Sequence, residues 1–90
     1  MDVEWDADKA RRNAAKHGFT FEEAVTVFLD PFELTVFDPD HSVTEDRYVS
    51  VGSSHAGRLL VVGYTERGGK IRMSFARRAT VREQMDYEEA

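Results

Sequence analysis

Three arginines and one histidine stand where segments of the chain end, and their chemistry suits work on a phosphodiester. Arg67 precedes a Gly-Gly pair, Arg77 and Arg78 end an alternating segment, and His17 ends a helical one. Arginine is permanently charged and can donate two parallel hydrogen bonds to a phosphate. Histidine titrates near neutral pH and can therefore transfer protons. Cutting RNA without a metal needs a base for the ribose 2′-OH, an acid for the 5′ oxygen and cations around the phosphorus. These residue types can supply all three.

Each of these residues also has a structural interpretation. Arg77 and Arg78 could pair with Glu83 or Asp86, which follow in the next predicted helix. A histidine at a helix end, such as His17, can interact with the last carbonyls of its own helix. An antiparallel sheet with one basic face is also a common way to hold RNA without cutting it. Residue types and spacing therefore leave both cleavage and simple binding open.

Glu66 and Tyr87 are further candidates for proton transfer. Glu66 could instead form an ion pair at the rim of a sheet. Tyr87 lies at helical spacing from Glu83 and could pack along that helix. Both alternatives stay open from the sequence.

The charges of the chain are gathered in blocks, although the net charge of −5 argues against a nucleic-acid partner. Residues 9–17 hold four Lys or Arg residues and no acid, and residues 58–82 hold seven with Glu66 as the only acid. A phosphate chain responds to such local patches rather than to the average. Ordinary solvated faces are the alternative. If the blocks bind RNA, we expect Lys16, Lys70 and Arg72 to contact it, together with Tyr87.

Composition excludes several kinds of site. The chain has no cysteine, which excludes disulfides and zinc–thiolate sites and favours a reducing compartment. No apolar run approaches the roughly 20 residues that cross a bilayer, and residues 1–4 are acidic where a signal peptide is basic. We therefore expect a cytoplasmic protein without a membrane partner. The Asp-Pro-Asp-His segment at residues 38–41 has metal-ligand atoms but not the spacing of a calcium loop, so we expect no metal and no cofactor.

Helices are expected at residues 7–17, 21–29 and 81–87. Asp6 is a suitable N-cap for the first helix, and Gly18 is its left-handed stop. Pro31 ends the second helix, because the residue before a proline avoids helical dihedrals. Capping boxes are indicated at the starts of the second and third helices, by Thr20 with Glu23 and by Thr80 with Glu83.

Strands are expected at residues 3–5, 32–37, 47–53, 59–65 and 70–77. A tight turn at Gly68-Gly69 and other turns join the last four, which predicts an antiparallel meander. The apolar residues of one face of the sheet must be shielded from water, so we expect the helices to cover that face. These residues are Val49, Leu59, Val61, Ile71 and Phe75. Residues 1–90 are thus predicted to form one α+β domain. It would be an antiparallel β-sheet meander with two N-terminal helices and a short C-terminal helix, and its second face would be free to bind a partner.

Three short motifs, taken in order, resemble the BrnT family of type II toxin–antitoxin toxins. They are Glu4-Trp5-Asp6, Lys16-His17-Gly18 and Ala76-Arg77-Arg78-Ala79. Other residues that match the family are Lys9, Asn13, Phe21, Glu23-Ala24, Arg47, Gly52, the apolar residues 59–62, Thr65-Glu66-Arg67, Ile71-Arg72, Ser74 and Glu83. The resemblance runs from Val3 to Tyr87. One departure is Met73-Ser74-Phe75, where the family has a more aliphatic strand, and we expect it to be neutral.

The resemblance implies a RelE-like ribonuclease fold and a toxin that arrests growth by cleaving RNA. It implies that residues matching His17, Arg67, Arg77 and Arg78 carry the activity, with Glu66 as an addition. It also implies a BrnA-like ribbon-helix-helix antitoxin that neutralises the toxin in a heterotetramer, so that operator DNA is met only through the antitoxin. Two other classes stay open: a non-catalytic module that binds the antitoxin, and an RNA-binding domain that does not cut.

Overall fold

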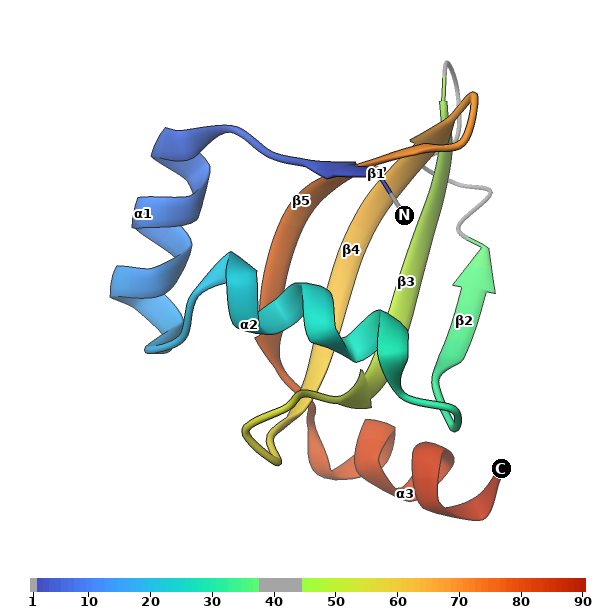
Figure 1. The fold of residues 1–90 in the computed structure, drawn as a ribbon. Coiled ribbons are helices and arrows are strands. Elements are labelled where there is room, and N and C mark those ends of the chain that lie inside the picture. Colours follow the sequence, from blue (N-terminus) through green and yellow to red (C-terminus); the bar gives the residue numbers. More distant parts are fainter. Residues whose placement is uncertain (1, 38–44) are drawn as a thin grey trace.

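The computed structural model describes residues 2–37 and 45–90, so the segment considered for a metal at residues 38–41 lies outside the described residues. Within that part, one sheet is flanked by helices (Figure 1). The strands are β1 (Asp2–Glu4), β2 (Leu34–Phe37), β3 (Asp46–Ser53), β4 (Leu59–Arg67) and β5 (Lys70–Arg78). The helices are α1 (Ala7–His17), α2 (Phe21–Val25), the 3-10 helix η1 (Thr26–Leu29) and α3 (Val81–Glu89). The α+β class predicted from the sequence is confirmed.

The strand order in the sheet is β1-β5-β4-β3-β2. Strands β2 to β5 form the predicted antiparallel meander. The edge strand β1 instead lies parallel to β5, with Asp2 opposite Lys70 and Glu4 opposite Arg72. The expectation of a purely antiparallel sheet is therefore wrong at this edge. The physical reason is that β1 is connected to the following strands by helices rather than by a hairpin turn. Such a long connection permits a parallel neighbour.

The first helix begins and ends where the sequence indicates. The Asp6 carboxylate accepts a hydrogen bond of 2.8 Å from the Asp8 amide, which fixes the N-terminus of α1. Gly18 ends the helix with a φ of 80°, a conformation that favours glycine. Asn13 then ties α1 to the sheet, because its side chain donates to the Ala76 carbonyl (2.8 Å) and accepts from the Ala76 amide (3.1 Å). The Asn13 side chain thus forms two hydrogen bonds to the backbone of β5 at a point that the short strand β1 does not reach.

The second helix has only half of its predicted capping box. The Thr20 hydroxyl accepts from the Glu23 amide at 3.1 Å. The Glu23 carboxylate does not return to Thr20; it accepts from the Ser54 hydroxyl at 2.7 Å and from the Arg58 guanidinium at 2.8 Å. Since Glu23 is only 7% exposed, these partners satisfy a buried charge and fasten α2 to the turn between β3 and β4.

The core lies between α2, η1 and one face of the sheet, which α2 crosses in Figure 1. The buried cluster consists of Phe19, Phe21, Ala24, Val27, Leu60, Val62, Tyr64, Met73 and Ala76. Burial of each large apolar side chain in it contributes about 1.5–3 kcal/mol. We call this face the covered face and the opposite one the open face. By strand alternation and pairing, the open face carries Arg47, Val49, Val51, Val61, Gly63, Thr65, Arg72, Phe75 and Arg77.

The predicted set of inward residues is wrong for most of its members. Ile71 packs against the core. Val61 is fully buried, as predicted, but its side chain lies on the opposite face, as does that of the partly exposed Phe75. Residues 59–65 form a continuous apolar run, and such a run carries no alternation that would tell one face from the other. In β5, a register shift between Gly63 and Tyr64 leaves Ser74 without an opposite residue and moves Phe75 to the open face.

Candidate active site

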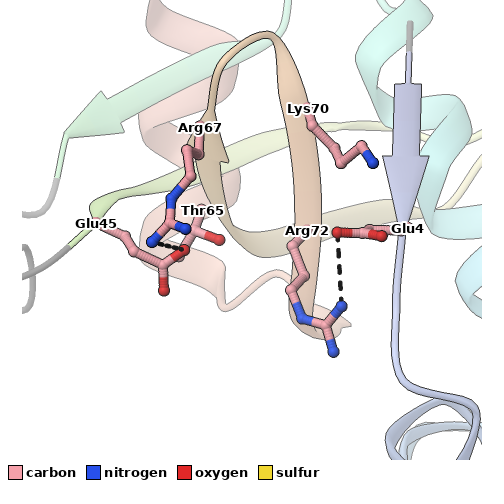
Figure 2. Close-up of a pocket in the computed structure, with 6 residues that line it drawn as sticks. All are labelled: Glu4, Glu45, Thr65, Arg67, Lys70 and Arg72. Atoms are coloured by element: carbon pink, nitrogen blue, oxygen red, sulfur yellow. Dashed lines mark ion pairs between the residues drawn. The ribbon is translucent and has the colours of Figure 1, made fainter.

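A cluster of basic side chains lies on the open face beside the hairpin that joins β4 and β5. Arg67, Lys70 and Arg72 line a cavity of about 260 Å³ together with Thr65, Glu4 and Glu45. Figure 2 shows the three basic side chains on the two strands of the hairpin, with one glutamate on each side. The three bases were predicted from the sequence, but neither glutamate was. The parallel pairing that brings β1 beside β5 has no local signal in the sequence.

The glutamates hold these arginines only loosely. The Arg67–Glu45 distance is 3.8 Å and the Arg72–Glu4 distance is 3.6 Å. The Arg67 side chain is 77% exposed and that of Arg72 is 51% exposed. Exposed ion pairs of this kind contribute little, about 0–1 kcal/mol. A phosphate can therefore replace either glutamate at small cost, so this end of the sheet is suited to bind an anionic chain.

At the far end of β5, Arg77 is held tightly by α3. Its guanidinium donates to both oxygens of Glu83, at 2.7 and 2.8 Å. Glu83 also accepts from the Thr80 amide at 2.8 Å, which completes the predicted capping box of α3. The hydrogen bonds from Arg77, reinforced by those from Thr80, lower the pKa of Glu83 from 4.5 to about 2 although partial burial opposes this. The structural alternative for Arg77, pairing with Glu83, is thus realised.

The ion pair leaves part of Arg77 for a second anion. Both contacts with Glu83 use the Nη1 and Nη2 end of the guanidinium. Within residues 2–37 and 45–90, no acceptor lies on Nε, and the Arg77 side chain remains 36% exposed. The edge formed by Nε and Nη2 can still form a two-bond contact with a phosphate.

The neighbouring residue Arg78 leaves the strand on the other side. It lies opposite Leu60 in the core cluster, whereas Arg77 lies opposite Val61 on the open face. His17 ends α1, which runs beside β5 toward the same end of the sheet (Figure 1). Lys16 is exposed in the same last turn. The end of β5 therefore carries Arg77 on the open face, Arg78 on the covered face, and the basic end of α1 on that side.

The structure places Arg67 far from Arg77 and Arg78, so these three candidate arginines do not form one cluster. Arg67 lies opposite Lys70, at the other end of β5. The strand from Lys70 to Arg78 spans eight steps of about 3.3 Å, or roughly 26 Å. A signal in the sequence could have shown this, because a hairpin that turns at residues 68 and 69 must send Arg77 away from Arg67. Glu66 lies opposite Ile71, so it leaves β4 on the covered side and away from the basic cluster.

Comparison with known proteins identifies the family. The family model described as the ribonuclease toxin BrnT of type II toxin–antitoxin systems matches residues 5–83. This chain belongs to the BrnT family. Its members are ribonuclease toxins that act with an antitoxin, and the motifs around His17 and Arg77 lie within the matched range.

A solved structure shares the fold. The ribonuclease toxin BrnT of Brucella abortus, known from a 1.1 Å crystal structure, aligns with a TM-score of 0.66 at 24% sequence identity. The alignment covers 89% of this chain and 97% of the Brucella protein. No protein with a curated description matches the sequence. In the described part of this BrnT-family chain, no helix has the length and apolar character to span a membrane.

Tyr87 has a structural partner rather than a free hydroxyl. It donates to the Asp30 carboxylate at 2.6 Å, and this bond raises the pKa of Tyr87 to about 12. Asp30 also accepts from the amides of Ser53 at 2.8 Å and Phe32 at 2.9 Å. The contact fastens α3 to the segment before β2. A phenol with so high a pKa is poorly matched to proton transfer near neutral pH, which favours the packing interpretation of Tyr87.

Proposed function

We propose that this protein is a cytoplasmic, metal-independent endoribonuclease, the toxin of a toxin–antitoxin pair, and that RNA lies along the open face of its sheet. The observation that carries the proposal is the arrangement of arginines on that face. Arg67 and Arg72 are only loosely paired at one end, and Arg77 keeps a donor edge at the other. Membership of a family of ribonuclease toxins supports the reaction type.

In the proposed mechanism, the two ends of β5 have different tasks. Arg67, Lys70 and Arg72 hold the phosphates of the RNA chain at the hairpin. Lys16, in the last turn of α1, would contact the RNA where the chain passes the other end of β5. Arg77 binds the scissile phosphate through its Nε edge and stabilises the charge that develops on it. Glu66, from its position, takes no part in this arrangement. The distance of roughly 26 Å along β5 separates binding at the hairpin from chemistry at Arg77.

The bond changes in this proposal are those of a transesterification. The ribose 2′ oxygen attacks phosphorus and gives its proton to a base, for which we propose His17. The bond from phosphorus to the 5′ oxygen breaks, and that oxygen takes up a proton from water. The products are a 2′,3′-cyclic phosphate and a free 5′ hydroxyl. Arg78 would neutralise the phosphate on the covered side of the strand end, where it and α1 lie.

The experiment is cleavage of a labelled RNA by the purified protein in EDTA. We expect cutting to persist in EDTA and to fall by at least about 100-fold in the Arg77→Ala, Arg78→Ala double variant. The matched control is Arg82→Ala, an 85% exposed arginine of α3 whose loss should leave cutting unchanged. A second control, Glu83→Gln, breaks the same ion pair but retains the cation. Loss of cutting in EDTA refutes the metal-free mechanism, and full cutting by the double variant refutes the site.

We further propose that the antitoxin is a BrnA-like ribbon-helix-helix protein that forms a heterotetramer with this chain and alone contacts operator DNA. The family's toxin–antitoxin character supports the existence of an antitoxin. Co-expression with the adjacent small gene, followed by light scattering of the purified complex, measures the composition directly. A different mass, or a neighbour without a ribbon-helix-helix sequence, contradicts this assignment.

One observation favours a second candidate, a non-catalytic module that only binds the antitoxin. The charge of Arg77 is already compensated by both oxygens of Glu83. Expression of the protein alone separates the two candidates. Growth arrest that the antitoxin relieves and that the Arg77→Ala, Arg78→Ala variant lacks supports the nuclease. Tight antitoxin binding without arrest or cleavage supports the module.

A further inference from the structure

An exposed aromatic ring lies in the middle of the open face, where neither α2 nor the core requires one. Phe75 is 38% exposed and lies in β5 opposite Gly63 of β4. The side chains on both sides of Gly63, Val62 and Tyr64, belong to the core cluster of the covered face. A Cβ on Gly63 would therefore point to the open face, and there it would overlap the ring of Phe75. The ring thus lies directly over the backbone of Gly63.

This seat supports the ring on one side and leaves its other side to solvent. Glycine is the residue that permits such close contact, because any side chain at position 63 would collide with the ring. Two apolar neighbours on the same face extend from the ring toward the edge of the sheet, and we call Phe75, Val49 and Val36 together the strip. Val49 lies opposite Gly63, and Val36, which is 62% exposed, lies opposite Val49.

Cations lie on either side of the ring along the same strand. On the open face, Arg72 precedes the ring and Arg77 follows it two residues later. Arg47 lies across the sheet from Arg72, with Thr65 of β4 between them. The Arg72 side chain is 51% exposed and that of Arg77 is 36% exposed. An aromatic ring between cations in an exposed strand is the arrangement by which proteins bind single-stranded nucleic acid: bases stack on the ring and phosphates meet the cations.

We propose that Phe75 is a base-stacking platform for single-stranded RNA, with Arg72 and Arg77 holding the phosphates on either side of the stacked base. The inference rests on the proposed function and adds to it a contact with a base. The charges select this occupant over an apolar protein surface. A protein partner would have to compensate the arginines that border the strip, whereas an RNA strand brings phosphates at regular intervals. The nucleotide on Phe75 would then be next to the phosphate that Arg77 contacts.

The test is binding of two fluorescent oligomers of equal length that the protein cannot cut. One is a single-stranded 2′-O-methyl RNA, and the other has the same sugar–phosphate chain without bases. We expect Phe75→Leu to weaken binding of the first oligomer by about 5- to 150-fold and to leave the second unchanged. Phe75→Tyr should retain binding, and Arg72→Gln should weaken both oligomers. Phe32→Leu, at a 72% exposed phenylalanine in the turn before β2, is the matched control and should change neither.

The outcomes separate the stacking proposal from the proposed function. If the unchanged protein cuts RNA and Phe75→Leu binds both oligomers normally, stacking is refuted and the nuclease stands. If Phe75→Leu weakens both oligomers equally although it melts like the unchanged protein, the effect is not stacking and the proposal falls. If Phe75→Leu binds RNA normally but loses the antitoxin, the strip is a protein contact and the proposal is wrong. If the unchanged protein neither binds the first oligomer nor cuts RNA, both proposals fail. Phe75→Met provides a second non-aromatic variant should Phe75→Leu unfold.

Discussion

Replacing Glu83 with glutamine should destabilise the protein by an amount that depends on pH. Glu83 accepts two hydrogen bonds from Arg77 and one from the amide of Thr80, so it joins the last strand to the start of α3. Glutamine has nearly the same shape but no charge, and it cannot accept from both ends of a guanidinium. The variant therefore removes the ion pair while it disturbs packing little.

The magnitude follows from the pKa of Glu83. Its fall from 4.5 to about 2 corresponds to about 3 kcal/mol at 1.36 kcal/mol per pKa unit. This is an upper bound, because the Glu83 side chain is 25% exposed and that of Arg77 is 36% exposed, so solvent screens the pair. We expect a loss of about 1–2 kcal/mol, which for a domain of this size lowers the melting temperature by roughly 5–15 °C.

The pH dependence has a definite sign. A depressed pKa in the folded state stabilises the protein fully above the unfolded value of 4.5, and this contribution disappears as the pH falls toward about 2. The stability difference between the unchanged protein and Glu83→Gln should thus be constant near neutral pH and fall to less than half at about pH 3. Urea unfolding followed by circular dichroism at both pH values measures it. The control is Asp86→Asn, because Asp86 forms only a 3.7 Å ion pair with an arginine that is 85% exposed. An equal difference at both pH values, or no difference at all, refutes the reasoning.

Three other perturbations have expected outcomes. Tyr87→Phe removes the hydrogen bond to Asp30 and should cost about 1–2 kcal/mol in urea unfolding; an unchanged midpoint would show that this contact does not hold α3. Gly63→Ala forces a methyl group into the ring of Phe75 and should cost about 1–3 kcal/mol, with partial recovery on adding Phe75→Leu; strictly additive losses would contradict the contact. Arg72→Ala should lower the slope of log affinity for RNA against log salt by about 1, and an unchanged slope would exclude a phosphate contact there.

Local signals were sufficient for most of the elements. The helix from Ala7 to His17 was predicted to the residue, because its N-cap Asp6 and its stop Gly18 act within one turn of the chain. The meander was predicted because turns such as Gly68-Gly69 bring neighbouring segments together. These features depend on residues close in sequence, so the sequence alone determines them. The sequence alone likewise identifies arginine and histidine as the residue types of the candidate site.

Only the tertiary structure decided which of those residues meet. It separates Arg67 from Arg77 along the length of β5, and it brings Glu4 beside Arg72 through a parallel strand. It also brings Glu83 onto Arg77, one of two pairings that the sequence left open.

Local signals in the sequence likewise could not predict which side chains lie on which face of the sheet. One unopposed residue in β5, Ser74, shifts the alternation and turns Phe75 from an expected core residue into an exposed ring over Gly63. The period of a strand is two residues, so a single bulge reverses the faces of the residues that follow it. The sequence determines the types of the side chains. Their grouping into a site depends on strand register and on contacts between distant segments, which local sequence patterns do not predict.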